Sequence, residues 1–218
     1  MRMRKMGITI FAFAIQLTIN AQWSGQIEAY KYTNFGESGS FQPLAHIASP
    51  GNWYGEIRYN YEDAKTLSLY IGKTFSGGRK LEYSFTPMTG YSTGRFTGLS
   101  IGINADVEWK NLYLSAQSQY SRSRLGKETS FTFSWSEVGI NLSDHLFGGV
   151  SLQYTRLLHE TTFEPGVVAG ISIRGFELPI YVFKPFSPER YFVLGISYEF
   201  SIGRKTKALS LAKTPEMP

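Results

Sequence analysis

The sequence of 218 residues contains no cysteine, only three histidines and few charged residues. Without cysteine, a secreted protein has no disulfides, so its stability must come from a closed hydrogen-bonded structure or a core. The absence also excludes a lipid attached to an N-terminal cysteine. Three scattered histidines give no basis for a transition-metal site, and we expect no cofactor. Charged residues make up 18%, below the roughly 25% of a typical soluble domain.

The sequence also lacks an apolar run long enough for a transmembrane helix, which needs about 20 residues. The run from Ile8 to Ile19 is short and interrupted by polar residues, and Ala21 offers a small residue for cleavage. With the basic residues that precede this run, residues 1–21 are predicted to be a signal peptide. Its removal takes away Arg2, Arg4 and Lys5, so the formal charge falls from +5 to +2. The basic charge of the whole chain therefore gives no case for nucleic-acid binding.

The segment Tyr191 to Ile202 has two faces of opposite chemistry, because side chains alternate sides along a strand. One face is continuously apolar: Phe192, Leu194, Ile196, Tyr198, Phe200 and Ile202. The other is small and polar with one charge: Val193, Gly195, Ser197, Glu199 and Ser201. Several earlier segments repeat this design, which predicts a transmembrane β-barrel of an outer membrane.

The alternating segments predict an all-β, antiparallel barrel of about ten strands, with eight as the alternative. The ten candidates are 54–62, 66–75, 80–88, 96–109, 112–122, 129–142, 146–158, 163–174, 176–183 and 191–202. Thr89–Gly94 is predicted to be one of the turns between them. In the candidate 129–142 the apolar set changes face after Trp135, which predicts a β-bulge near Ser136. In 176–183, Pro179 predicts a bulge or a strand end.

The chain is expected to divide into four parts. Residues 1–21 are the signal peptide, 22–52 a periplasmic lead-in that plugs or braces the barrel, 53–202 the barrel, and 203–218 a basic periplasmic tail. If the chain enters from the periplasm, the periplasmic turns hold about four residues or fewer, as outer-membrane barrels prefer.

A soluble lipocalin-like barrel would show the same alternation with its apolar face inward. The polar face favours the membrane barrel, because it carries glycine, serine and glutamine where a water-exposed face usually carries lysine, glutamate and threonine. Aromatic residues also gather near the strand ends, as in interfacial girdles.

Gly195, Tyr198 and Phe200 resemble the targeting signal in the final strand of outer-membrane barrels, a glycine followed by two hydrophobic positions. Eighteen residues follow Phe200, whereas many such proteins end on the aromatic residue itself. The run from Asn52 to Glu62, with Gly72-Lys73-Thr74-Phe75, is also similar to a family of small Gram-negative outer-membrane barrels without an assigned activity. The resemblance implies the fold, the outer-membrane location and contact with the insertion machinery and membrane lipid.

Seven charged residues fall on the predicted inward faces and are expected to form a lumen charge network: Glu56, Arg58, Glu82, Asp106, Glu108, Arg174 and Glu199. Buried charges are tolerated when they are paired and hydrogen-bonded. We interpret the set as a structural network in a packed lumen. The alternative is a narrow channel whose charges select ions.

His159, followed by Glu160, Thr161 and Glu164, is the most enzyme-like group, since a histidine, a hydroxyl and a carboxylate form hydrolytic triads. His-x-Thr is similar to the His-x-Ser of outer-membrane lipid A deacylases, but threonine replaces serine. The competing interpretation is a polar hairpin tip, and we expect no enzyme.

The sequence thus favours an outer-membrane barrel with a structural or partner-binding role, in contact with a periplasmic or membrane protein. A narrow pore for ions or small solutes is the second hypothesis. A surface lipid or peptide hydrolase using His159 is the third.

Overall fold

The computed structural model describes residues 22–33 and 39–203. The predicted signal peptide, and all of the predicted tail after Gly203, lie outside the described residues. The strands are β1 (Trp23–Thr33), β2 (Phe41–Ala48), β3 (Trp53–Tyr59), β4 (Thr66–Lys73), β5 (Phe75–Gly78), β6 (Leu81–Gly94), β7 (Gly98–Trp109), β8 (Leu112–Ser123), β9 (Phe131–Ser143), β10 (Leu146–Leu157), β11 (Glu160–Ile173), β12 (Phe176–Phe183) and β13 (Tyr191–Ile202). A 3-10 turn, η1 (Lys127–Thr129), precedes β9.

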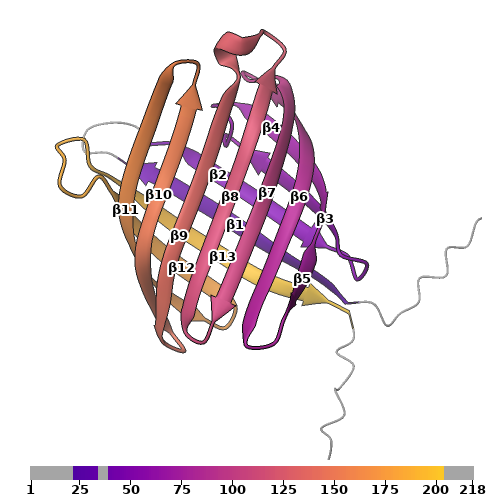
Figure 1. Cartoon of the computed structure of the whole chain (residues 1–218), viewed down its shortest axis with the longest axis vertical. Helices are drawn as coiled ribbons and strands as arrows, with labels where there is room; N and C mark the ends of the chain where they lie inside the picture. Colours follow the sequence, from indigo (N-terminus) through magenta and orange to yellow (C-terminus); the bar gives the residue numbers. More distant parts are fainter. Residues whose placement is uncertain (1–21, 34–38, 204–218) are drawn as a thin grey trace, which may run out of the picture.

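All of these strands belong to one antiparallel sheet, which closes on itself into a barrel (Figure 1). β1 pairs with β13, and β4 pairs with β6. β5 continues β4 along β6 with no change of register between the pairs Gly72↔Met88 and Phe75↔Phe85. The ladder is interrupted only beside Pro87, which has no N–H to donate. The ring therefore has twelve strands, and β5 is an extension of β4.

The expectation of ten strands was wrong, as was the eight-strand alternative, because residues 22–52 are not a lead-in. β1 and β2 lie in the barrel wall, where β1 pairs along its whole length with β13. The predicted turn at Thr89–Gly94 was also wrong, since these residues continue β6 and pair with β4. The prediction failed at β1 and β2 because their faces are less cleanly divided than those of later strands.

The two ends of the barrel differ in the length of their connections. The end where β1 begins and β13 ends carries tight turns, among them Lys110–Asn111 and Arg174–Gly175. Lys110 and Arg174 have positive φ angles, as two-residue hairpins of the primed types require. The opposite end carries the longer connections, including Asn60–Lys65, 124–130 and 184–190. Short turns lie on the periplasmic side of outer-membrane barrels, so we assign the first end to the periplasm.

The two faces of the wall have the chemistry of a barrel immersed in lipid. Along β7, Leu99 and Ile101 point outward and are 63% and 64% exposed, while Ser100 between them is 1% exposed. Most of the large exposed hydrophobic side chains lie on the outward face, and buried serine, threonine and glutamine face inward. No helix in the described part of the chain is long and apolar enough to cross a membrane. This arrangement is that of a transmembrane β-barrel of the outer-membrane type.

In the extracellular half of β9 the apolar side chains point inward and the polar ones outward, the reverse of the other strands. Its register with β8 is unbroken from Ser121↔Phe131 to Leu112↔Ile140, so the predicted bulge near Ser136 was wrong. The register with β10 shifts only near the periplasmic turn, between Leu146 and Phe147. As a result Phe131, Phe133 and Trp135 point into the lumen, and Thr132, Ser134 and Ser136 point outward.

Pro179 interrupts the pairing of β12 with β13 without ending the strand. The ladder is missing at Leu178 and Pro179 and resumes at Ile180↔Leu194. On its other side β12 pairs with β11 through Gly170↔Pro179. The interruption expected from the missing N–H is therefore present, but the strand passes through it.

Five inward aromatic rings each face a glycine directly across the ladder: Tyr30↔Gly195, Tyr70↔Gly90, Tyr113↔Gly139, Phe147↔Gly170 and Phe183↔Gly166. A Cβ added to Gly90, for example, would lie 2.4 Å from the ring of Tyr70. The missing side chain leaves room for the ring to lie flat on the neighbouring strand, an arrangement that also stabilises glycine in sheets. The inward glycines thus determine where aromatic rings fill the lumen.

We predict that Gly90→Ala displaces the Tyr70 ring and destabilises the barrel by about 1–3 kcal/mol, the usual cost of overpacking. The matched control is Gly55→Ala, because Gly55 points outward and an added Cβ would meet only Ile47, at 3.8 Å. The measurement is the temperature at which the compact, faster gel band of the unboiled protein converts to the slower unfolded band. Equal conversion temperatures for the two variants would contradict this account of the glycines.

Candidate functional site

The periplasmic half of the lumen is a cavity of about 1120 Å³. It reaches the mouth of the barrel, because turn residues such as Lys110, Asn111 and Asp144 contribute to its lining. Eight carboxylate side chains line it: Glu28, Glu56, Asp106, Glu108, Glu137, Asp144, Glu177 and Glu199. The basic side chains among its lining residues are Lys110 and His46. We call this cavity the acidic vestibule.

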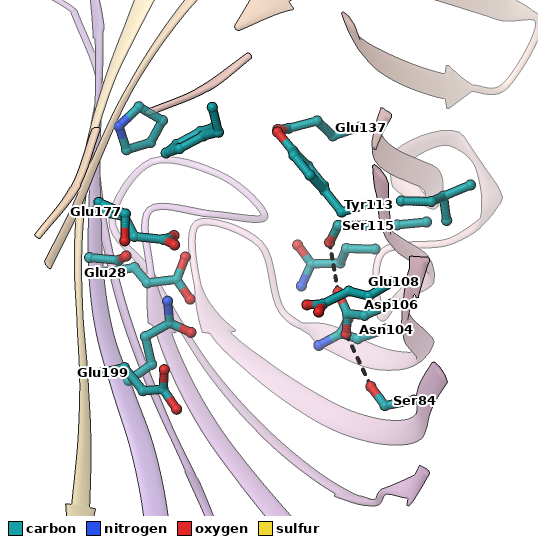
Figure 2. Close-up of a pocket in the computed structure, with 18 of the residues that line it drawn as sticks. Glu28, Ser84, Asn104, Asp106, Glu108, Tyr113, Ser115, Glu137, Glu177 and Glu199 are labelled. Carbon is teal, nitrogen blue, oxygen red and sulfur yellow. Dashed lines mark hydrogen bonds between the residues drawn. The ribbon is translucent and has the colours of Figure 1, made fainter. Parts of the chain in front are cut away.

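Carboxylates of the acidic vestibule face one another from opposite walls (Figure 2). Glu28, Glu177 and Glu199, on β1, β12 and β13, project toward Asp106 and Glu108 on β7. Because these strands are far apart around the ring, the two groups meet only across the lumen. A charged cavity with low-dielectric walls focuses the field of its charges. The acidic vestibule therefore has the side chains to create a negative potential inside the barrel.

The individual carboxylates differ in how they are held. Asp106 accepts hydrogen bonds from Ser115 at 2.9 Å and Ser84 at 3.2 Å. Glu177 and Glu199 form no side-chain hydrogen bond or ion pair with other described residues. Such carboxylates are free to meet water or a passing ion, whereas that of Asp106 is fixed in position.

On the extracellular side of the acidic vestibule, one part of the lumen is filled by a cluster centred on Arg58. The Arg58 side chain is fully buried. Its Nε pairs with Glu56, and its Nη1 donates to Gln119 at 2.6 Å and lies 3.6 Å from Glu62. The guanidinium lies against the ring of Tyr61, 4.6 Å from its centroid. We call these residues, with Tyr70 on the other face of the guanidinium at 4.3 Å, the Arg58 cluster. The one buried cation thus has two carboxylates beside it, which leaves the cluster with a formal charge of −1.

Tyr61 and Glu62 of the Arg58 cluster come from the connection between β3 and β4, which folds back into the lumen. Tyr61 donates a hydrogen bond to Gln117 and packs edge-on against Phe133, at 5.7 Å between centroids. Glu62 accepts a hydrogen bond from Tyr70 at 2.8 Å. A connection at the extracellular end thus supplies part of the barrier inside the barrel.

A second part of the lumen, beside the Arg58 cluster, is filled by a group of aromatic side chains that we call the aromatic plug. Its centre is a group of buried side chains, Val168, Tyr181, Phe183 and Val193, surrounded by the rings of Tyr30, Tyr32, Trp135, Phe147 and Tyr191. Phe183 is fully buried, and Trp135 from the reversed part of β9 packs edge-on against it, at 5.9 Å between ring centroids. The Trp135 indole also donates to Ser151 at 2.8 Å, so its polar atom is satisfied. The Arg58 cluster and the aromatic plug together fill part of the lumen with buried side chains.

Above the aromatic plug, the connection between β12 and β13 is fastened to the wall by charge. Lys184 lies 3.2 Å from Glu164 on β11 and 3.1 Å from Glu189 within the connection. Its hydrogen bond to Glu189, and then that to Glu164, raises the pKa of Lys184 above its usual value. Glu164 also accepts a hydrogen bond from Tyr191 at 3.0 Å.

The structure brings together only some of the charges expected in the lumen network. Glu56 and Arg58 are buried and paired, while Asp106, Glu108 and Glu199 line the acidic vestibule. Glu82 lies with Asp106 and Glu108 around a second cavity of about 380 Å³ at the periplasmic rim. Arg174 is not a lumen residue, because it lies exposed in the β11–β12 turn with φ 52°. Its sequence parity suited the inward face, but β11 ends one residue earlier.

Several lining carboxylates were missed from the sequence. Glu28 lies on β1, which was assigned to a lead-in, and it stands 3.9 Å from His46 on β2. Glu137, inward on β9, was not among the charges expected in the lumen. Glu177 alternates with the outward, apolar Phe176 and Leu178, and this alternation would have identified it as inward.

His159 lies exposed in a two-residue turn between β10 and β11. Among the described residues it has no hydrogen bond to Thr161 or to a carboxylate, so the parts of a hydrolytic triad are not assembled around it. No group of three or more potential metal ligands is present in the described part of the chain.

In β13, Gly195 lies inward beneath the ring of Tyr30, while Tyr198 and Phe200 lie on the outward face. The ring of Tyr198 packs against that of Phe176 in a tilted arrangement, 4.4 Å between centroids. The role of these three residues as an insertion signal stays a prediction.

The barrel is similar in fold to solved porins. A structure of the KdgM porin in complex with disordered oligogalacturonate aligns with a TM-score of 0.61 and 9% identity, over 80% of this chain and 99% of that one. A second KdgM porin structure aligns with a TM-score of 0.58 and the same identity and coverage.

No protein-family description and no curated protein matches the sequence. At 9% identity the likeness concerns the fold alone. Both the comparisons and the closed ring agree on that fold: the chain is a porin-like β-barrel of the type found in the outer membrane of Gram-negative bacteria.

Proposed function

We propose that the protein is a narrow outer-membrane pore for small cationic or neutral solutes, and that the extracellular half of its lumen is closed in this structure. The observation that carries this proposal is the acidic vestibule, which opens toward the periplasm inside a twelve-stranded barrel. A lumen filled only for stability would not need a cavity of about 1120 Å³ lined by so many carboxylates. Rings of acidic side chains are the usual way in which pores select cations.

The charge of the acidic vestibule also separates this chain from its structural neighbour. The KdgM porin was solved with oligogalacturonate, which is a chain of sugar acids. Carboxylates on the wall repel a polyanion, because like charges in a confined cavity raise the energy of entry. We therefore infer that this barrel uses a similar fold for solutes of the opposite charge or of none.

Conduction requires the outer half to open, and the β3–β4 connection is the segment best placed to move. Tyr61 and Glu62 reach into the lumen from this connection and are held by contacts to Arg58, Gln117 and Tyr70. The wall strands behind them are paired on both sides and cannot move without breaking the ring. Withdrawal of one connection therefore opens a path beside Arg58 at the smallest cost in hydrogen bonds.

A barrel with a structural or partner-binding role is the second candidate, and the closed outer half is the observation that favours it. Arg58 is fully buried and paired with Glu56 and Glu62, as expected for a permanent seal. The two candidates differ in one measurable property, because a permanent seal conducts no ions on any timescale.

We predict that Tyr61→Ala raises the single-channel conductance in planar bilayers several-fold, because the Tyr61 ring reaches into the lumen between the acidic vestibule and the extracellular end. Tyr59→Ala is the matched control, since Tyr59 is two residues earlier but points outward and is 42% exposed. Both variants should keep the gel shift of the folded barrel. If the wild type and folded Tyr61→Ala are both silent in either orientation, the pore proposal fails and the sealed barrel stands.

We further predict that conducting channels prefer cations over anions, and that Glu177→Gln with Glu199→Gln lowers this preference. Both residues line the acidic vestibule without side-chain partners, so their neutralisation removes charge without removing a structural contact. The measurement is the reversal potential in a salt gradient, which should move toward zero in the double variant.

The control for that experiment is Glu128→Gln with Glu160→Gln, which removes two exposed carboxylates at the extracellular end. Its reversal potential should match that of the wild type. An unchanged reversal potential in the vestibule variant would show that the acidic lining does not set selectivity.

A further inference from the structure

A patch of positive charge lies on the outer surface at the extracellular end of β8 to β10. It consists of Arg122 at the end of β8, Arg124 and Lys127 in the following connection, and Arg156 near the end of β10. All four side chains are exposed. We call Arg122 and Arg156, with Thr132 between them, the arginine rim.

The register of the strands places the arginine rim on the lipid-facing side. Tyr120 and Arg156 are the ladder partners of Thr132 on its two sides, and Arg122 follows Tyr120 on the same face. The backbones of Tyr120 and Arg156 are therefore roughly 10 Å apart, two strand spacings, and Arg122 lies roughly 7 Å further along β8. The long side chains of Arg122 and Arg156 can therefore reach one group that lies outside the wall beside Thr132.

The arginine rim also lacks acidic partners, in contrast to other cations at this end. Lys184 pairs with Glu164 and Glu189, and Arg95 lies 3.3 Å from Asp63. Arg122 and Arg156 form no ion pair with any other described residue. Their charge is therefore available to a partner outside the chain.

Exposed aromatic side chains mark the depth of the arginine rim in the membrane. Tyr120 is 44% exposed just below Arg122, and Phe163, 61% exposed, packs against Tyr154 at 5.1 Å between centroids. Rings of this kind gather at the membrane interface. The arginines one step nearer the extracellular end thus lie at the level of the lipid headgroups.

The reversed part of β9 supplies a second, independent feature beneath the arginines. Ser134 on β9 and Ser118 on β8 face outward, and their hydroxyls are 2.7 Å apart, so each satisfies the other. Tyr154 on β10 is the ladder partner of Ser134. Tyr120 is the next outward residue after Ser118 on β8. A strip of short side chains therefore extends along the outer surface from the arginine rim toward the middle of the membrane.

We propose that the arginine rim binds the phosphorylated headgroup of an outer-leaflet lipid. The guanidinium groups of Arg122 and Arg156 donate paired hydrogen bonds to phosphate oxygens, for which their planar geometry is suited. The Thr132 hydroxyl donates to the same group from between them. One acyl chain of the lipid packs along the strip over Ser118 and Ser134.

The test compares two double variants of the whole protein in detergent, titrated with bis-phosphorylated lipid A and observed by native mass spectrometry. Arg122→Gln with Arg156→Gln should bind this lipid at least about tenfold more weakly than the wild type, because each arginine loses a charge-assisted contact. The control, Lys31→Gln with Arg95→Gln, removes two positive charges at the same end but away from β8 to β10, from β1 and from the β6–β7 connection. It should bind as the wild type does.

Wild-type protein should also bind the dephosphorylated lipid about tenfold more weakly, and inorganic phosphate alone should not compete at millimolar concentration. Equal binding by both double variants would overturn the proposal, as would equal binding of the two lipids. Full competition by inorganic phosphate would reassign the rim to free phosphate. The gel shift of each unboiled variant verifies that the barrel is folded, and the readout does not depend on conductance.

Discussion

The constraint on which the rest of the structure depends is that backbone N–H and C=O groups find no water in the hydrocarbon of a membrane. A sheet with free edges would leave two rows of such groups unpaired, so the first and last strands must meet. The pairing of β1 with β13 over their whole length satisfies this requirement. It also explains why residues 23–48 cannot be an independent lead-in: without β1 and β2, β13 and β3 would each be an edge in lipid.

Closure fixes the size of the ring, and the interior then has to be filled or left hollow. Here the two halves of the lumen have different solutions. Inward glycines accept aromatic rings at both ends of the lumen, and in the extracellular half β9 also turns Phe131, Phe133 and Trp135 inward. In the periplasmic half many of the inward side chains are acidic, and a cavity remains. The reversal of β9 has an effect on both surfaces, since the same register that fills the lumen leaves Thr132, Ser134 and Ser136 facing lipid.

The distribution of charge follows the same division. Arg58, the buried cation, is paired with Glu56 and lies beside Glu62, since a buried charge needs a partner. The carboxylates of the acidic vestibule need no such pairing, because the cavity admits water. Outside the barrel, Arg122 and Arg156 have no ion-pair partner among the described residues, and we propose that a lipid headgroup supplies the opposite charge. The charges that have no partner within the chain are found in the acidic vestibule and in the arginine rim. These are the two places where we propose a ligand or a passing ion.

The sequence by itself determined the class of fold, the two faces of most strands and the periplasmic turns, because alternation and turn chemistry are local properties with a period of two residues. It placed Glu56, Asp106, Glu108 and Glu199 inward for the same reason. It could not determine the number of strands, since closure depends on which distant strands meet. The facing of β9 was decided by tertiary structure, because aromatic residues are compatible with lipid and with a packed lumen alike. The entry of Tyr61 and Glu62 into the lumen was decided there too: their partners Gln117, Phe133 and Arg58 come from three different strands, and only the closed ring brings them together.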